Sequence, residues 1–231
     1  MFPTTRSSAI SDLLSGDPAR QARSVNVIAE GYWQPAHRYM QLRWRASESE
    51  AADLVQSFFE NVVRRGLLAT YQPARARFRT FLRTCLDHHA VDHHRRRSAQ
   101  RRGGGAGEVE LSDAEHALAD HAAVDPDQLF EAEWLRHIMQ LAITRLDERL
   151  VAAGKPTHAA LFRAFHVGDG APTYAEAAAE HGCSVTDVTN WLHGARKEFR
   201  KIALELLREL TIDDDDFAAE AMAVFGIDVT K

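Results

Sequence analysis

The sequence predicts an all-α protein built from two small domains. Apolar residues recur at steps of three and four along most of the 231-residue chain, and this is the period of an amphipathic helix. No segment shows the alternation of apolar and polar residues that is typical of a half-buried strand. Composition and charge change abruptly at Gly103–Gly105, so we place a boundary between two helical regions there.

Charge is distributed unevenly along the chain. The formal net charge of -5 would by itself argue against nucleic-acid binding. However, residues 75–102 hold nine arginines and two aspartates, whereas residues 103–133 hold nine acidic residues and no lysine or arginine. The average therefore hides a basic block that is suited to DNA phosphates.

Cysteine content and apolar runs predict the compartment. Cys85 and Cys183 are too few for a disulfide framework, which favours a reducing environment. No apolar run is long enough to span a bilayer, and the N-terminus lacks an apolar signal core. We therefore expect a cytoplasmic protein that makes no membrane contact.

The first region should contain three helices. Residues 1–24 mix Ser, Thr, Pro and Arg without a sustained period, so we expect a flexible segment. Helical patterning begins at Val25 and runs toward Trp44. A second helix should end at Gly66. Its predicted buried stripe consists of Ala51, Leu54, Val55, Phe58 and Val62.

A loop and a basic helix follow. Residues 71–77 read as a loop, and a third helix then runs from Phe78 into the arginines at 95–97. Phe78 and Phe81 fit core positions better than DNA contacts. Tyr71 and the loop backbone are better candidates for capturing an unstacked base.

The second region should also be helical. We expect a flexible acidic linker over 103–128, a helix over 129–151 and a short helix over 157–166. An acidic tail, 211–231, contains the aspartate run 213–216 and a last amphipathic piece.

Two capping boxes mark a pair of helices near the C-terminus. The first is Thr173 with Glu176, the second is Ser184 with Asp187, and Gly182 between them allows a tight turn. The second helix should bury Val185, Val188, Leu192, Ala195, Phe199 and Ile202. Residues 173–201 therefore predict a helix-turn-helix DNA-binding unit, with an ordinary solvated helix face as the alternative.

Three passages together resemble the extracytoplasmic-function (ECF) type of bacterial RNA polymerase sigma factor, of the sigma-70 family. Residues 50–59 resemble the helix that docks on polymerase. Residues 71–97 resemble the promoter-melting loop and the -10 recognition helix, and residues 174–197 resemble the helix-turn-helix that reads the -35 element. The resemblance implies a sigma-2-like helical bundle over 25–102 and a sigma-4-like domain over 129–210.

The resemblance also implies which residues act. Core polymerase would be bound by Glu48, Glu50, Asp53, Leu54, Gln56 and Phe58. The -10 DNA would be bound by Tyr71, Arg75, Arg77, Arg79, Arg83, His88, Arg95, Arg96 and Arg97. The -35 DNA would be bound by Ser184, Thr186, Thr189, Asn190, His193, Arg196, Lys197 and Arg200.

The implied partners are the β′ clamp helices and the β flap of core RNA polymerase, together with promoter DNA. Catalysis would belong to the polymerase, so the chain itself should be no enzyme and should need no cofactor. The family usually has further acidic residues where this chain has Ala52 and Ser57. An anti-sigma factor is a candidate regulator, as is a kinase that would restore negative charge at Ser57.

Two other functions compete with this interpretation. A free-standing regulator would use the helix-turn-helix alone and dimerise through other helices. A metal-dependent nuclease would depend on the histidine cluster at 88–94, in which His89 and His93 lie four positions apart. No HExxH pattern or second ligand cluster supports the nuclease, so we expect no metal site.

Overall fold

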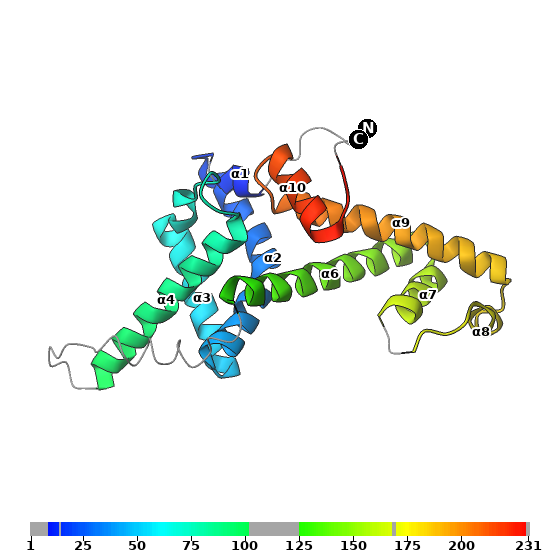
Figure 1. Ribbon diagram of the computed structural model, residues 1–231, viewed down its shortest axis with the longest axis horizontal. Coiled ribbons are helices and arrows are strands. Elements are labelled where there is room, and N and C mark those ends of the chain that lie inside the picture. Colours follow the sequence, from blue (N-terminus) through cyan, green and yellow to red (C-terminus); the bar gives the residue numbers. More distant parts are fainter. Residues whose placement is uncertain (1–8, 14, 102–124, 168–169, 230–231) are drawn as a thin grey trace. The chain divides into compact units, whose positions relative to one another are not determined.

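The computed structural model describes residues 9–13, 15–101, 125–167 and 170–229 (Figure 1). Over these residues the chain forms helices and no strand, which confirms the predicted all-α class. The chain divides into two compact units. Unit 1 comprises Met1–His137 and Glu209–Lys231, and unit 2 comprises Ile138–Arg208. The predicted acidic linker, 103–128, lies outside the described residues up to position 124.

The N-terminal part is more helical than predicted. Helix α1 covers Ala9–Leu13 and helix α2 covers Pro18–Trp44, so helix replaces much of the expected flexible segment 1–24. Asp17 is the reason that α2 starts early, because its carboxylate accepts a hydrogen bond of 2.9 Å from the backbone N–H of Ala19. Pro18 favours the same start, since its fixed φ suits the first helical turn.

Helix α3 covers Glu48–Arg65 and begins with a capping box in which Ser47 and Glu50 bond reciprocally. It ends at Gly66, whose φ of 60° is left-handed, as the sequence predicted. The predicted stripe of α3 is buried at all five positions. A short 3-10 helix, η1 (Leu67–Thr70), then leads to the loop 71–77 and to α4 (Phe78–Arg101).

The C-terminal residues belong to unit 1. Helix α10 covers Asp214–Phe225, and it corresponds to the last amphipathic piece that we expected within the acidic tail 211–231. The first part of α6 (Pro126–Ala152) also belongs to unit 1, so unit 2 begins at Ile138, later than the sigma-4-like domain that we expected over 129–210. Gly31 of α2 permits Leu210, which follows α9, to pack closely on α2, because a Cβ at position 31 would lie 2.7 Å from Cδ1 of Leu210.

Aromatic side chains fill the core of unit 1. Tyr32 of α2 stacks on Phe130 and Trp134 of α6, with ring centroids 6.4 and 6.2 Å apart. It also meets Phe78 of α4 edge to face at 5.6 Å. These four rings are all buried, so helices from distant parts of the sequence share one core.

Unit 2 contains the rest of α6 with α7 (Pro156–His166), α8 (Tyr174–Glu180) and most of α9 (Val185–Glu209). Arg149 of α6 bonds Glu198 and Glu205 of α9 at 2.9 and 2.6 Å. An apolar core in unit 2 joins α7, α8 and α9 and consists of Leu161, Ala177, Ala178, Val188 and Leu192. No helix among the described residues is long and apolar enough to cross a membrane.

Candidate nucleic-acid interface

The predicted -10 residues are exposed mainly at the two ends of the basic helix. Arg75 lies on the loop that precedes α4, and Arg95 and Arg96 lie near its C-terminal end. His88 is exposed in the middle of the same helix. Arg75, Arg95 and Arg96 are cationic, and solvent, and therefore a phosphate backbone, can reach all four side chains.

Arg79 does not belong to that surface. Its side chain is 7% exposed, forms an ion pair with Glu220 of α10, and bonds Glu131 of α6 at 2.5 Å. The guanidinium also lies 5.0 Å from the ring centre of Trp134. A buried guanidinium requires such partners, because removing its charge from water is costly. In this arrangement the partners occupy Arg79, and its contact with DNA stays a prediction.

Arg83 is likewise held within unit 1. It bonds Asp87 one turn along α4 at 2.8 Å and Asp127 of α6 at 3.0 Å. Asp87 also accepts hydrogen bonds of 3.0 Å from the Tyr39 hydroxyl and from the Trp44 indole N–H. We call these residues the Asp87 network. This network ties α2 and α6 to α4, so Arg83 helps to position the basic helix. Its contact with DNA stays a prediction.

Tyr71, which we expected to capture a base, is 5% exposed. Its hydroxyl donates a 3.0 Å hydrogen bond to the carbonyl of Ala76, and its ring packs on Phe78 and Phe81. Burial, together with the nearby carboxylates of Asp216 and Glu220, raises the pKa of Tyr71 to about 12. Tyr71 therefore braces the loop from inside, and the structure gives its ring no exposed face for a base.

The predicted polymerase-binding set on α3 splits between surface and core. Glu48, Asp53 and Gln56 are exposed and form a polar face. Leu54 and Phe58 are 3% and 0% exposed, so they pack in the core of unit 1, and their contact with polymerase stays a prediction. The helical period explains the split, because positions three and four apart in the sequence share one face.

Glu50 connects this helix to the basic helix. Its carboxylate forms an ion pair with Arg97, a predicted -10 residue, and completes the capping box with Ser47. The hydrogen bond from Arg97, followed by those from Ser47, lowers the pKa of Glu50 to about 2. A residue of the predicted polymerase site and one of the predicted DNA site thus bind each other.

This pair predicts a pH dependence. The Glu50 contribution to stability should be complete above the ordinary carboxyl pKa of 4.5, and it should be lost as pH falls toward about 2. Replacing Arg97 with glutamine should return the pKa of Glu50 toward its ordinary value. An NMR titration of the side-chain carboxyl carbon would measure this change. Arg96→Gln is the control, and an equal change in both variants would contradict the assignment.

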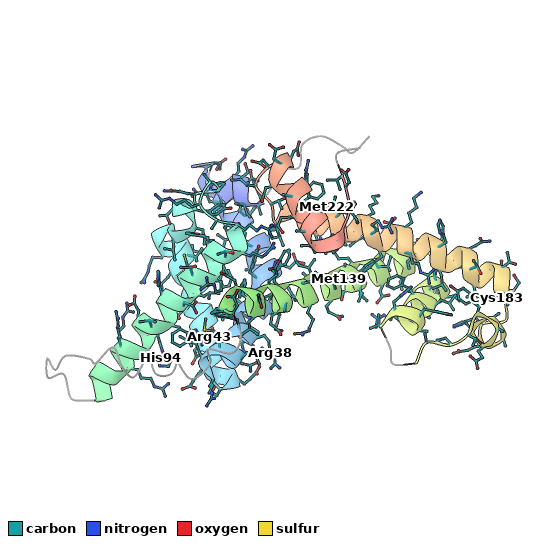
Figure 2. All side chains as sticks on the ribbon, viewed as in Figure 1. Arg38, Arg43, His94, Met139, Cys183 and Met222 are labelled. Carbon is teal, nitrogen blue, oxygen red and sulfur yellow. The ribbon has the colours of Figure 1, made fainter. Side chains whose placement is uncertain are left out.

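The histidine cluster on α4 has other partners. Nε2 of His89 lies 2.7 Å from Oγ of Ser57, and His94 stacks on Trp44 with ring centroids 5.5 Å apart. Figure 2 labels His94 on α4. Among the described residues, no three His, Cys, Asp or Glu side chains are grouped so that they could hold a metal ion. The Ser57 hydroxyl also donates to the carbonyl of Leu54 at 3.0 Å.

Helices α8 and α9 are joined by a tight turn. Gly182 in this turn has a φ of 62°, which glycine adopts without strain. Both predicted capping boxes are present, because Thr173 bonds Glu176 reciprocally and Ser184 does the same with Asp187. The hydrogen bonds from Ser184 lower the pKa of the Asp187 carboxyl. Each helix start is therefore fixed by its own sequence.

The predicted -35 residues lie on the outer surface of α9. The predicted buried stripe holds at Val188, Leu192, Ala195 and Ile202, and Phe199 is half-buried. Val185 departs from it and is 48% exposed, because it lies in the first turn beside the cap. The exposed predicted residues are Thr186, Thr189, Asn190, His193, Arg196, Lys197 and Arg200, and Ser184 serves as the cap.

Arg196 has a partner on α7. Its Nε donates a 3.0 Å hydrogen bond to Nε2 of His166, and its guanidinium lies 3.5 Å from the Tyr174 hydroxyl. Burial, and then the charge of Arg196, lowers the pKa of His166. His166 is therefore suited to accept this bond as a neutral imidazole, which orients the guanidinium at the surface.

Sequence reasoning missed the acidic partners in unit 1. Glu220, Glu131 and Asp127 all bond arginines of α4 from helices that are distant in the sequence. One signal was available, because Glu220 is a single carboxylate between Ala219 and Ala221 in an otherwise apolar stretch. Such a residue is buried only if a cation meets it.

A model of the Sigma-70 region 2 family matches residues 32–100. This segment runs from α2 through α3 and the loop 71–77 to the end of α4, and it contains both predicted sites of unit 1. A comparison with curated proteins and one with solved structures gave no match. Sigma-70 region 2 acts in promoter recognition and melting and binds core RNA polymerase and promoter DNA. Residues 32–100 of this chain are therefore similar to sigma-70 region 2.

Proposed function

We propose that the protein is an ECF-type sigma factor with two promoter-reading surfaces. The observation that carries the proposal is the sigma-70 region 2 match over 32–100. It is combined with unit 2, in which helix α9 exposes a row of polar and cationic side chains. Two linked DNA-binding surfaces suit two separated promoter elements, because binding of the first raises the effective concentration of the second.

Unit 1 would serve polymerase binding and the -10 element. The exposed polar face of α3, with Glu48, Asp53 and Gln56, would meet the β′ clamp helices of core polymerase. Arg75, Arg95 and Arg96 would hold backbone phosphates of the -10 element, because a dense cationic surface positions DNA without reading its sequence. The loop 71–77 would contact the opened strands through its backbone.

Unit 2 would read the -35 element with α9 and meet the β flap. Asn190 lies near the N-terminal end of the helix, and an amide side chain can bond the edge of an adenine in the major groove. Lys197 and Arg200 lie further along, where they suit flanking phosphates. Regulation by an anti-sigma factor or a kinase remains a prediction of the family resemblance.

Run-off transcription with core polymerase and the purified protein tests the proposal. We expect transcripts only from templates that carry both matched promoter elements. The control is a double variant, Glu48→Gln with Asp53→Asn, which should lower core affinity and transcript yield together. Tight operator binding by the protein alone, with neither core binding nor transcripts, would instead favour a free-standing regulator.

The two kinds of contact on α9 predict different responses. Asn190→Ala should cost about 1–3 kcal/mol of binding free energy and relax specificity at one base pair. Lys197→Ala should weaken binding to all sequences and reduce the slope of log affinity against log salt by about one. Affinities of the assembled holoenzyme for a set of -35 variants, measured at several salt concentrations, would check both. Identical losses on every sequence would show that our assignment of these contacts is wrong.

A further inference from the structure

Helix α10 lies against the part of unit 1 that we propose to face -10 DNA. Nε of Arg77 lies 3.3 Å from one carboxylate oxygen of Glu220, and the guanidinium of Arg79 bonds the other. The Glu220 side chain is only 5% exposed, although glutamate is normally a surface residue. A single carboxylate of α10 therefore binds one arginine of the loop and one from the first turn of the basic helix.

The rest of α10 adds negative charge near the same loop. Its first turn holds Asp214, Asp215 and Asp216, and Asp213 caps it. Besides burial, the carboxylates of Asp216, Glu220 and Asp213 contribute to the raised pKa of Tyr71 in the loop. The acidic helix α10 thus contacts the arginine-containing loop 71–77 with negative charge, and a phosphate backbone would bring the same charge to this loop.

We propose that α10 is an autoinhibitory strap, in which Glu220 occupies Arg77 and Arg79 and must leave before DNA can bind them. The inference rests on the proposed function, because it takes the start of α4 to be a DNA-binding surface. Carboxylate and phosphate both accept paired hydrogen bonds from a guanidinium, so the two compete for the same arginines. Arg75 is exposed on the loop and is available for a first contact with DNA.

The strap makes a prediction that a structural role does not. If only the strap-free form engages DNA fully, the apparent dissociation constant increases as the population of that form falls. Weakening the Glu220 contact should then increase DNA affinity. If the ion pairs served stability alone, the same change would lower stability and would leave DNA affinity unchanged or reduced. The sign of the change in affinity therefore separates the two roles.

The experiment compares two variants of the full-length chain. Glu220→Gln removes the charge that holds the arginines, whereas Asp215→Asn removes one exposed charge from the same helix. Fluorescence anisotropy with a labelled single-stranded oligonucleotide at low salt measures the affinity. We expect Glu220→Gln to bind about three- to tenfold more tightly than the natural chain, and Asp215→Asn to stay within about twofold. Equal affinities in the two variants, or weaker binding by Glu220→Gln, would overturn the proposal.

Hydrogen exchange on the unaltered chain provides a second test that does not depend on how the variants fold. Amides of residues 214–225 should lose protection when the same oligonucleotide saturates the protein, because α10 leaves its site. Unchanged protection of these amides at saturation would overturn the proposal.

Failure of the strap and failure of the proposed function give different results. Transcripts from the natural chain, with no gain in DNA affinity for Glu220→Gln, would leave the sigma factor proposal intact and remove the strap. A gain in affinity without any transcription or core binding would keep the strap as a control of DNA binding and would remove the sigma factor proposal.

Discussion

Replacing Phe58 with alanine should lower the free energy of unfolding of unit 1 by about 3–5 kcal/mol. The side chain is completely buried and meets the rings of Phe59 and His89 edge to face, with centroids 5.4 and 5.8 Å away. Alanine would leave a cavity among these rings that the surrounding helices cannot fill without moving. Chemical denaturation followed by circular dichroism measures the loss.

The control for Phe58 is Gln56→Ala, on the exposed face of the same helix. It should change stability by no more than about 0.5 kcal/mol and should lower the affinity for core polymerase. Phe58→Ala should lose core binding only to the extent that it unfolds. A stable Phe58→Ala variant that no longer binds core would place Phe58 at the interface, as the sequence predicted.

Replacing Asp87 with alanine should destabilise unit 1 by about 2–4 kcal/mol. The change removes the shared acceptor of Tyr39, Trp44 and Arg83, and these partly buried donors would then lack a partner of equal strength. Asp87→Asn should have an intermediate effect, because the amide keeps one acceptor oxygen but loses the charge. Urea denaturation midpoints of the purified variants would measure both effects.

Asp92→Ala is the matched control for Asp87. It makes the same change on the exposed surface of the same helix, so any gain in helix propensity cancels in the comparison. We expect the Asp92 variant to unfold at nearly the natural midpoint. Similar midpoints for both variants would mean that the Asp87 network contributes little to stability.

Local signals in the sequence predicted local structure well. The stripe of α3, the stop at Gly66 and the capping boxes that begin with Thr173 and Ser184 each depend on residues a few positions apart, and each is present. The early start of α2 was missed although Asp17 and Pro18 are a recognisable pair. The surrounding Ser, Thr and Arg residues show no sustained apolar period, so a helix was not predicted there.

Contacts between residues that are distant in the sequence were not predicted. Arginines were assigned to DNA because they cluster in the sequence, yet the partners of Arg79 come from α6 and α10. The burial of Tyr71 was missed as well, although its ring packs on Phe78 and Phe81 nearby in the sequence. A periodic pattern states which face of a helix is apolar, but it does not state which charged residue another helix will neutralise.

The division of the chain also determines the order in which its parts can fold during synthesis. Unit 2 is one continuous stretch, residues 138–208, whereas unit 1 needs residues from both sides of it. A ribosome releases the N-terminal residues first, so Arg79 emerges well before Glu220 exists. Unit 2 can therefore complete its core while unit 1 still lacks α10, and the final closure of unit 1 must wait for the last residues to be translated.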